Sequence, residues 1–290
     1  MALNSMTGFG RFRTEVNGRT VTVDVQSVNS KQIDINLRIP FLYKSLESDI
    51  RQRVTQAVER GKVDVHVHVE SVLADDLPSL NLPLASHYIA ELRRLQQSQG
   101  VHESDLLAVV SRMPDVFKAR QADPSREELN QILETLDGAL SQLGSFRVGE
   151  GKRLAVVLMQ QLDSILAELK AIEVFEPERI VKIRERLQKN LDELARPEAI
   201  DANRLEQEMV YYLEKLDFTE EKVRLKSHCE FFLEVMKDPA PGKKLGFIAQ
   251  EIGREINTLG AKASHAGIQH HVVRMKEELE KIKEQLLNIL

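Results

Sequence analysis

The segment KLGFIAQEIGREINTLG, residues 244–260, has the spacing of a helix with one apolar face and one polar face. At about 100° per residue, its isoleucines and Leu259 fall within an arc of about 80°, which is typical of a helix packed on a core. Gln250, Arg254 and Asn257 lie on roughly the opposite side. Glu255 lies beside the apolar stripe, where we expect partial burial of its carboxylate. The segment therefore predicts a helical C-terminal region with a polar site on one flank.

A second helix with a matching polar row is predicted just before this segment. Glu221, Arg224 and His228 stand at positions i, i+3 and i+7, so their side chains share one face. Arg204 and Glu208 form an i, i+4 pair on the helix before that. His228 is the imidazole of this row and is therefore the natural general acid or base near neutral pH.

A turn at residues 241–244, Pro-Gly-Lys-Lys, joins the two helices. It places two cations just before a helix N-terminus, where backbone N–H groups also attract anions. Cations that hold phosphates, carboxylates that hold a metal or activate water, and a histidine that transfers a proton suit phosphodiester cleavage. Two alternatives use the same residues: phosphate binding without cleavage, and an ordinary solvated helix surface, where Glu–Arg pairs are common.

The composition favours a mostly helical protein with a sizeable core. The chain has 290 residues, of which 42% are hydrophobic, 29% charged and 5% aromatic, with no tryptophan. Its net charge of −5 argues against attraction of nucleic acid over the whole surface, so a nucleic-acid site would be local or assembled from several chains. Cys229 is the single cysteine, and no apolar run is long enough for a signal peptide or a membrane span. We therefore expect a cytoplasmic protein without a membrane partner.

The predicted fold class is α+β, and the sheet belongs to an N-terminal domain at residues 1–72. Period-two alternation predicts strands near 6–16, 21–26, 33–39 and 63–69, and the spacing between 42 and 58 predicts a helix. We expect a small antiparallel sheet covered on one face by this single helix. The two histidines of the last strand, at 66 and 68, share its polar face and lack a third metal ligand, so we interpret them as surface residues.

The rest of the chain is predicted to be mostly helical, with long helical hairpins. We divide it into a linker with short helices at 73–127, a long helical hairpin at 128–200, and a C-terminal helical domain at 201–290 that carries the site. Residues 150–152, Glu-Gly-Lys, are interpreted as a step between helices. The last helix has a heptad seam from Ile268 to Ile289, which needs a partner helix in the same bundle or in another subunit.

These segments together resemble the YicC/YloC family of bacterial proteins. The N-terminal matches are Ser5–Gly10, Ser27–Ser30, Leu37–Pro40 and Arg60–Val63. The C-terminal matches are Asn203–Glu208, Glu220–Glu221, Arg224–Leu225, Ser227–His228, Gly242–Leu245, Gln250–Glu251, Arg254–Glu255, Asn257–Thr258, Glu280–Ile282 and Gln285. The resemblance spans nearly the whole chain.

The resemblance implies an endoribonuclease that cuts single-stranded or structured RNA. It further implies a homohexamer with an interior RNA channel and dependence on a divalent metal, Mg²⁺ or Mn²⁺. Six copies of the cations facing one cavity would make a positive interior in an acidic protein. Other RNA-decay enzymes are candidate partners. The alternative is a non-catalytic oligomeric RNA-binding adaptor or chaperone.

With this resemblance, the polar residues take predicted roles. The catalytic candidates are His228, Glu221, Glu251 and Glu255. The metal-binding candidates are Glu208, Glu251 and Glu255. The candidate RNA contacts are Arg204, Arg224, Lys243, Lys244, Gln250, Arg254 and Asn257.

Two positions depart from the family pattern. The family usually has Asp where this chain has Gly246, and usually ends in Asn-Ile-Glu where this chain has Asn-Ile-Leu at 288–290. If the Asp binds metal, this protein is impaired or uses Glu251 and Glu255 instead. If the Asp only caps the helix, glycine replaces it at a cost of a few tenths of a kcal/mol.

Overall fold

The computed structural model describes residues 3–16, 18–71, 79–99, 105–118, 124–194 and 202–290. The chain divides into two compact units. We call the unit formed by Phe9–Gln26 and Ser30–Leu143 the sheet unit, and the unit formed by Met1–Gly8, Ser27–Asn29 and Gly144–Leu290 the bundle unit. The predicted boundaries at 72 and 200 lie outside the described residues.

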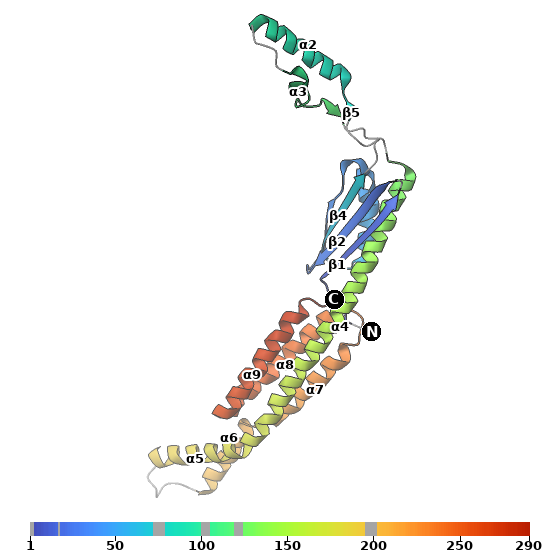
Figure 1. Ribbon diagram of the computed structural model, residues 1–290. Helices are drawn as coiled ribbons and strands as arrows, with labels where there is room; N and C mark the ends of the chain where they lie inside the picture. Colours follow the sequence, from blue (N-terminus) through green and yellow to red (C-terminus); the bar gives the residue numbers. More distant parts are fainter. Residues whose placement is uncertain (1–2, 17, 72–78, 100–104, 119–123, 195–201) are drawn as a thin grey trace. The chain divides into compact units, whose positions relative to one another are not determined.

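A four-stranded sheet with the order β1-β2-β4-β3 forms the sheet unit's framework (Figure 1). Its strands are β1 (Gly8–Val16), β2 (Arg19–Val28), β3 (Ile33–Arg38) and β4 (Gly61–Ser71), which confirms the four predicted strands. Alternation along each strand sends one set of side chains into the core. The alternating valines of β2 and β4, at 21, 23, 25, 63, 65 and 67, are buried there.

The expectation of an antiparallel sheet is wrong for its last pair. Strands β3 and β4 pair in parallel, with Ile35 opposite Val63. Parallel neighbours need a crossover connection between them. The 3₁₀ turn η1 (Phe41–Leu46) and helix α1 (Glu47–Ala57) supply it, because they lie between the two strands in the chain.

The expectation of a single covering helix is also wrong. Besides α1, the first part of α4 (Arg126–Ala171) packs on the sheet, and its Leu136 and Ala139 lie in the same core. Gly10 of β1 is required for this packing, since a Cβ there would lie 2.1 Å from the Ala139 carbonyl oxygen. The sequence pattern did not reveal this cover because α4 is far from the strands in the chain.

A small subdomain of the sheet unit lies between β4 and α4 in the chain. It comprises α2 (Leu82–Gln99), α3 (Leu106–Val110) and a two-stranded ribbon of β5 (Ser79–Leu80) and β6 (Phe117–Lys118). It has its own minor core, which includes Ala85, Val110 and Val116. Residues 73–78, with which the predicted segment 73–127 begins, lie outside the described residues.

The bundle unit is built from long helices (Figure 1). They are the second part of α4, a 3₁₀ turn η3 (Ile172–Phe175), α5 (Glu176–Leu194), α6 (Ala202–Lys215), α7 (Thr219–Val235), α8 (Gly242–Ala263) and α9 (Ala266–Leu286). The interpretation of residues 150–152 as a step between helices is wrong, because α4 continues through them. Gly151 has a packing reason instead: a Cβ there would lie 1.6 Å from the Leu3 carbonyl oxygen.

Helix α9 packs within its own chain. The seam residues from Ile268 to Ile289 are buried in the bundle core together with residues of α4, α7 and α8. The sequence left open whether this seam packs in its own bundle or on another subunit. Because the seam residues are buried in the core of this chain, they pack in its own bundle. Within the described ranges, no helix combines the length and the apolar composition needed to cross a membrane.

Candidate active site

Helices α7 and α8 form the scaffold of the candidate site. A short turn connects them, so they run side by side in the bundle (Figure 1). Leu225, Cys229 and Phe232 of α7 share one core with Ile252 and Ile256 of α8. Burial raises the pKa of the Cys229 thiol to about 12, which leaves it neutral and unsuited to act as a nucleophile.

Three predicted residues converge on the flank of this helix pair. One ligand atom each from His228 of α7 and from Glu251 and Glu255 of α8 lie within 4.8 Å of one another. The two glutamates are four residues apart, so they stack on one face of α8. His228 is half-buried, Glu251 is exposed and Glu255 is buried, which confirms the expected burial of Glu255 beside the apolar stripe.

Glu255 is the unusual member of this cluster. Only 6% of it is exposed, and within the described part of the chain its carboxylate has no hydrogen bond or ion pair, although its oxygens keep some contact with solvent. A buried carboxylate without a partner is costly, and a cation would offset its charge. An imidazole nitrogen with two carboxylate oxygens is a donor set that binds divalent transition metals such as Mn²⁺, whereas Mg²⁺ prefers oxygen alone. The donor chemistry and the unpaired carboxylate both fit a divalent cation.

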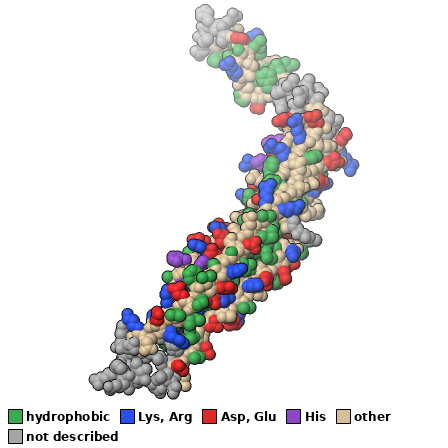
Figure 2. Space-filling view, turned by 60° about the horizontal axis from the view of Figure 1, so that its bottom comes forward, with side chains coloured by type: hydrophobic (Ala, Val, Ile, Leu, Met, Phe, Trp, Pro, Cys, Tyr) green, Lys and Arg blue, Asp and Glu red, His purple; other side chains and the backbone are tan. Residues whose placement is uncertain are grey.

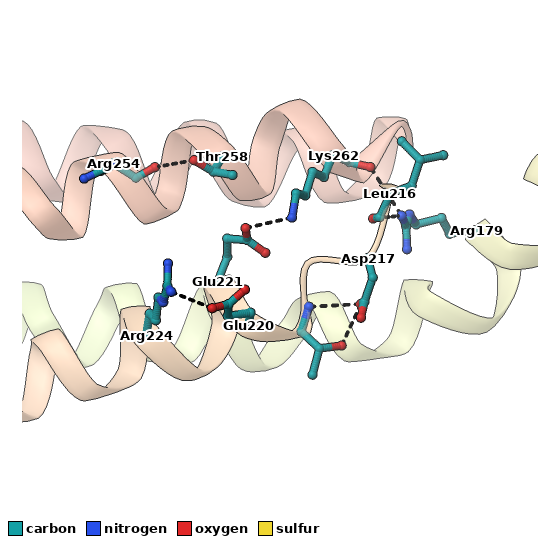
Figure 3. A network of polar contacts seen from close by, with 10 residues as sticks. Arg179, Leu216, Asp217, Glu220, Glu221, Arg224, Arg254, Thr258 and Lys262 are labelled. Atoms are coloured by element: carbon teal, nitrogen blue, oxygen red, sulfur yellow. Dashed lines mark hydrogen bonds and ion pairs between the residues drawn. The ribbon is translucent and has the colours of Figure 1, made fainter. Parts of the chain in front are cut away.

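The predicted RNA contacts on α7 and α8 are exposed side chains. Arg224 pairs with Glu220 at 2.5 Å (Figure 3). Arg254 lies 3.7 Å from Glu251. Exposed pairs of this kind are weak, so either arginine can turn to a phosphate at little cost. Lys243, Gln250 and Asn257 are also exposed.

Lys244 has two local partners. Its ammonium lies 3.0 Å from the Asp238 carboxylate and 5.3 Å from the centre of the Phe231 ring. The side chains of Arg204 and Glu208, on α6, lie outside the described residues. Figure 2 shows acidic and basic side chains interspersed over the helices rather than a continuous basic surface.

Glu221 is not brought into the cluster. Its Oε1 accepts a hydrogen bond of 2.8 Å from Lys262 Nζ, across the α7–α8 pair (Figure 3). Its other oxygen, Oε2, is buried and has no partner among the described residues. Its catalytic role stays a prediction, and the contact seen here joins the start of α7 to the end of α8.

Arg179 of α5 is a structural residue that the sequence reasoning missed. Its guanidinium donates to the carbonyl oxygens of Leu216, Lys262 and Ala263, at the ends of α6 and α8. It also lies 4.6 Å from the centre of the Phe218 ring. Burial lowers its pKa, but an arginine remains charged. No sequence signal separates this arginine from the exposed ones of the same amphipathic helix.

Comparison with known proteins covers both units. Residues 3–156 match the family described as "Endoribonuclease YicC-like, N-terminal region", and residues 172–290 match "Endoribonuclease YicC-like, C-terminal". The chain belongs to the YicC-like endoribonuclease family. A relative named "Probable endoribonuclease YicC" from Clostridioides difficile strain 630 is 35% identical over 290 residues, covering 98% of this chain and 99% of the relative.

A second relative with the same name gives the same match. It comes from Haemophilus influenzae strain ATCC 51907 / DSM 11121 / KW20 / Rd and is 30% identical over 288 residues, covering 98% of this chain and 99% of its own length. The YicC-like C-terminal match includes all of α7 and α8, and therefore the whole cluster of His228, Glu251 and Glu255.

The structure also bears on the YicC-like position 246. Gly246 lies inside α8, five residues beyond the N-cap Pro241, so an Asp there would not cap the helix. Around a helix it lies about 180° from position 255. An Asp at this position of α8 would therefore point away from Glu255, and the cluster forms without it.

Proposed function

We propose that this protein is an endoribonuclease whose Glu251 and Glu255 hold a divalent cation and whose His228 transfers a proton. The convergence of these three side chains within 4.8 Å carries the proposal. Membership in the YicC-like family and the names of the relatives support the class of reaction. Within this proposal the protein is a cytoplasmic homohexamer that encloses its RNA, and the cation held by the two carboxylates is Mg²⁺ or Mn²⁺.

Each residue of the site has a separate role in the proposed cleavage. A bound cation would lower the pKa of water and offset charge on the scissile phosphate. Glu255 is held in place by its buried position on α8, while exposed Glu251 can adjust to the ligand. His228, whose ring nitrogen lies within 4.8 Å of both carboxylate groups, would transfer a proton at the scissile bond. Arg224 and Arg254 lie on the two facing helices, where they would bind the flanking phosphates (Figure 3).

The substitution Glu255→Gln tests the proposal, because it removes the charge and keeps the size of the side chain. We expect cleavage of a structured RNA in the presence of Mn²⁺ to fall by about a hundredfold or more. Mn²⁺ binding, measured by the loss of the free-ion EPR signal, should weaken in parallel. Glu230→Gln is the matched control, since Glu230 is an exposed glutamate of α7 outside the cluster. If Glu255→Gln cleaves RNA or binds Mn²⁺ as well as the wild-type protein does, the assignment of Glu255 as a metal ligand is overturned.

His228→Ala separates proton transfer from metal binding. We expect this variant to retain Mn²⁺ binding within a few-fold while it loses cleavage. If His228 is a ligand instead, Mn²⁺ binding falls together with cleavage. Tight RNA binding that survives EDTA, without cleavage under any metal, would instead identify a non-catalytic adaptor, since the exposed cations do not depend on the cluster.

A further inference from the structure

A cavity with a partly polar lining lies in the bundle unit, away from the cluster of His228, Glu251 and Glu255. Its volume is about 470 Å³, and it is formed by α5, α6 and the residue that follows α8. The polar residues that line it are Lys182, Arg186, Tyr212, Lys215 and Ser264. None of them belongs to the His228 cluster. Ser264 lies nine residues beyond Glu255, about 14 Å along the helix.

The described side chains that line this cavity carry a positive charge. They include three cations and no carboxylate. Lys182 is paired with Glu178 at 2.6 Å. Neither Arg186 nor Lys215 has an ion pair to any residue in the described ranges. In a protein with a net charge of −5, two free cations that share a cavity indicate an anionic ligand.

A buried histidine with an unsatisfied ring nitrogen contacts the lining residue Lys182 from outside the cavity. His265 follows the lining residue Ser264 and is only 8% exposed. Its Nε2 lies 3.5 Å from Lys182 Nζ and 3.8 Å from Glu178. Its Nδ1 is buried and has no hydrogen-bond partner among the described residues. Buried polar atoms without partners are rare, so this edge has unused hydrogen-bonding capacity.

An aromatic side chain completes the lining. Tyr212 is 41% exposed, and its ring makes an edge contact with Tyr211 at 5.9 Å between centroids. A half-exposed tyrosine beside cations is the usual arrangement for stacking one base while the phosphate is neutralised. Free phosphate alone would not use the ring. The chemistry of the cavity therefore fits a nucleotide better than an inorganic anion.

We propose that this cavity binds the terminal nucleotide of an RNA chain through its phosphate monoester. Arg186 and Lys215 would contact the phosphate, Lys182 would contribute at the edge, and Tyr212 would stack on the base. A phosphate monoester carries more charge than a diester inside the chain, so two free cations favour an end over the middle of a strand. This proposal rests on the proposed function, because it takes RNA as the substrate. It adds a site that holds the end of the RNA chain, which we call the anchor.

The test compares RNA ends in the absence of divalent metal, so that cleavage does not interfere. A short single-stranded RNA is prepared with a 5′-phosphate, with a 3′-phosphate and with neither, and binding to the full-length protein is measured by fluorescence anisotropy. We expect one phosphorylated end to bind about tenfold more tightly than the unphosphorylated RNA. The double variant Arg186→Ala/Lys215→Ala should lose this preference. Arg184→Ala, on the same helix but outside the cavity lining, should keep it.

The possible outcomes separate this proposal from the proposed function. Equal binding of all three RNAs, or a preference that persists in the double variant, would overturn the anchor even if the protein cleaves RNA. A preference that depends on Arg186 and Lys215 supports it even if no cleavage is found. Competition with AMP tests whether the ligand is an RNA end or a free mononucleotide. If AMP displaces the phosphorylated RNA completely and binds with a low Kd of its own, the site is for a free mononucleotide and the RNA-end proposal is overturned. Thermal melting of each variant confirms that it folds.

Discussion

Glu221 and Glu255 are two buried carboxylates on facing helices, and they differ in their partners. Glu221 is paired with Lys262, whereas Glu255 has no ion pair within the described ranges and lies near His228 and Glu251. The sequence predicted both as catalytic candidates, because helical spacing shows which residues share a face but not what lies opposite. The tertiary structure therefore makes Glu255 the stronger candidate and gives Glu221 a visible structural partner.

Lys262→Met should destabilise the protein by leaving Glu221 buried without its cation. We expect a loss of about 1–3 kcal/mol in the free energy of unfolding, since Lys262 itself is partly exposed to solvent. Urea unfolding followed by circular dichroism measures it. Lys243→Met is the control, because Lys243 is an exposed cation of the same helix. A double variant Glu221→Gln/Lys262→Met should recover part of the loss, and no recovery would contradict the pairing.

Asp217 should make stability depend on pH at the start of α7. Its Oδ1 accepts hydrogen bonds from the Thr219 hydroxyl at 2.7 Å and from the Thr219 backbone N–H at 3.0 Å (Figure 3). These hydrogen bonds lower the pKa of the Asp217 carboxyl. A lowered pKa means that the stabilisation is complete above the unfolded pKa of about 3.9 and is lost as the pH falls through the folded pKa.

The variant Asp217→Asn tests this dependence. Near neutral pH we expect wild type to be more stable than the variant by about 0.5 kcal/mol, because a carboxylate at a helix N-terminus is favourable. The difference should shrink towards zero in acid, where the wild-type carboxyl is protonated. Chemical denaturation at a series of pH values measures it. A difference that stays constant with pH would show that the charge of Asp217 is not what matters.

At the scale of single helices and strands, sequence periodicity predicted which faces are buried but not how neighbouring elements pair. The spacing of α8 correctly predicted its buried isoleucines, since a helix has one period throughout. The same reasoning could not separate a parallel from an antiparallel β3–β4 pair, because side-chain alternation is identical in both. Nor could it explain the glycines of α8, whose roles depend on what packs against them.

Two glycines of α8 should respond oppositely to alanine. A Cβ at Gly246 meets nothing within 4 Å, whereas a Cβ at Gly242 would lie 2.5 Å from the Ile289 carbonyl oxygen. We expect Gly246→Ala to stabilise the protein by about 0.5–1 kcal/mol through helix propensity. Gly242→Ala should destabilise it by about 1–3 kcal/mol, because the backbone at Ile289 must shift. Thermal melting of the pair measures both, and the same sign in both variants would contradict the packing described.

At the scale of the whole molecule, the charge requires an explanation. The chain is acidic overall, with a net charge of −5, while its proposed ligand is RNA. The exposed cations of α7 and α8 are local, and their effect would be multiplied if several chains presented them to one cavity. In such an assembly the seam of α9 would not supply the contact between chains, since its residues are buried within the chain.

The proposed hexamer predicts a mass in solution of six times 33.0 kDa. Light scattering coupled to size-exclusion chromatography measures this mass directly. We also expect RNA affinity to fall steeply with salt, because several cations per complex would release counterions. A mass equal to one chain at micromolar concentration would contradict the assembly, and an affinity independent of salt would contradict phosphate contacts by these cations.

The sequence by itself determined the class of the protein, its strands, its long helices and the face of α8 that is buried, because these follow from local periodicity and from the family motifs. Only the tertiary structure decided which polar residues meet. It joined His228 to Glu251 and Glu255 and paired Glu221 with Lys262. The physical reason is that these contacts depend on how far α7 and α8 are rotated and shifted against each other, which the packing of their cores sets and which no spacing within one helix records.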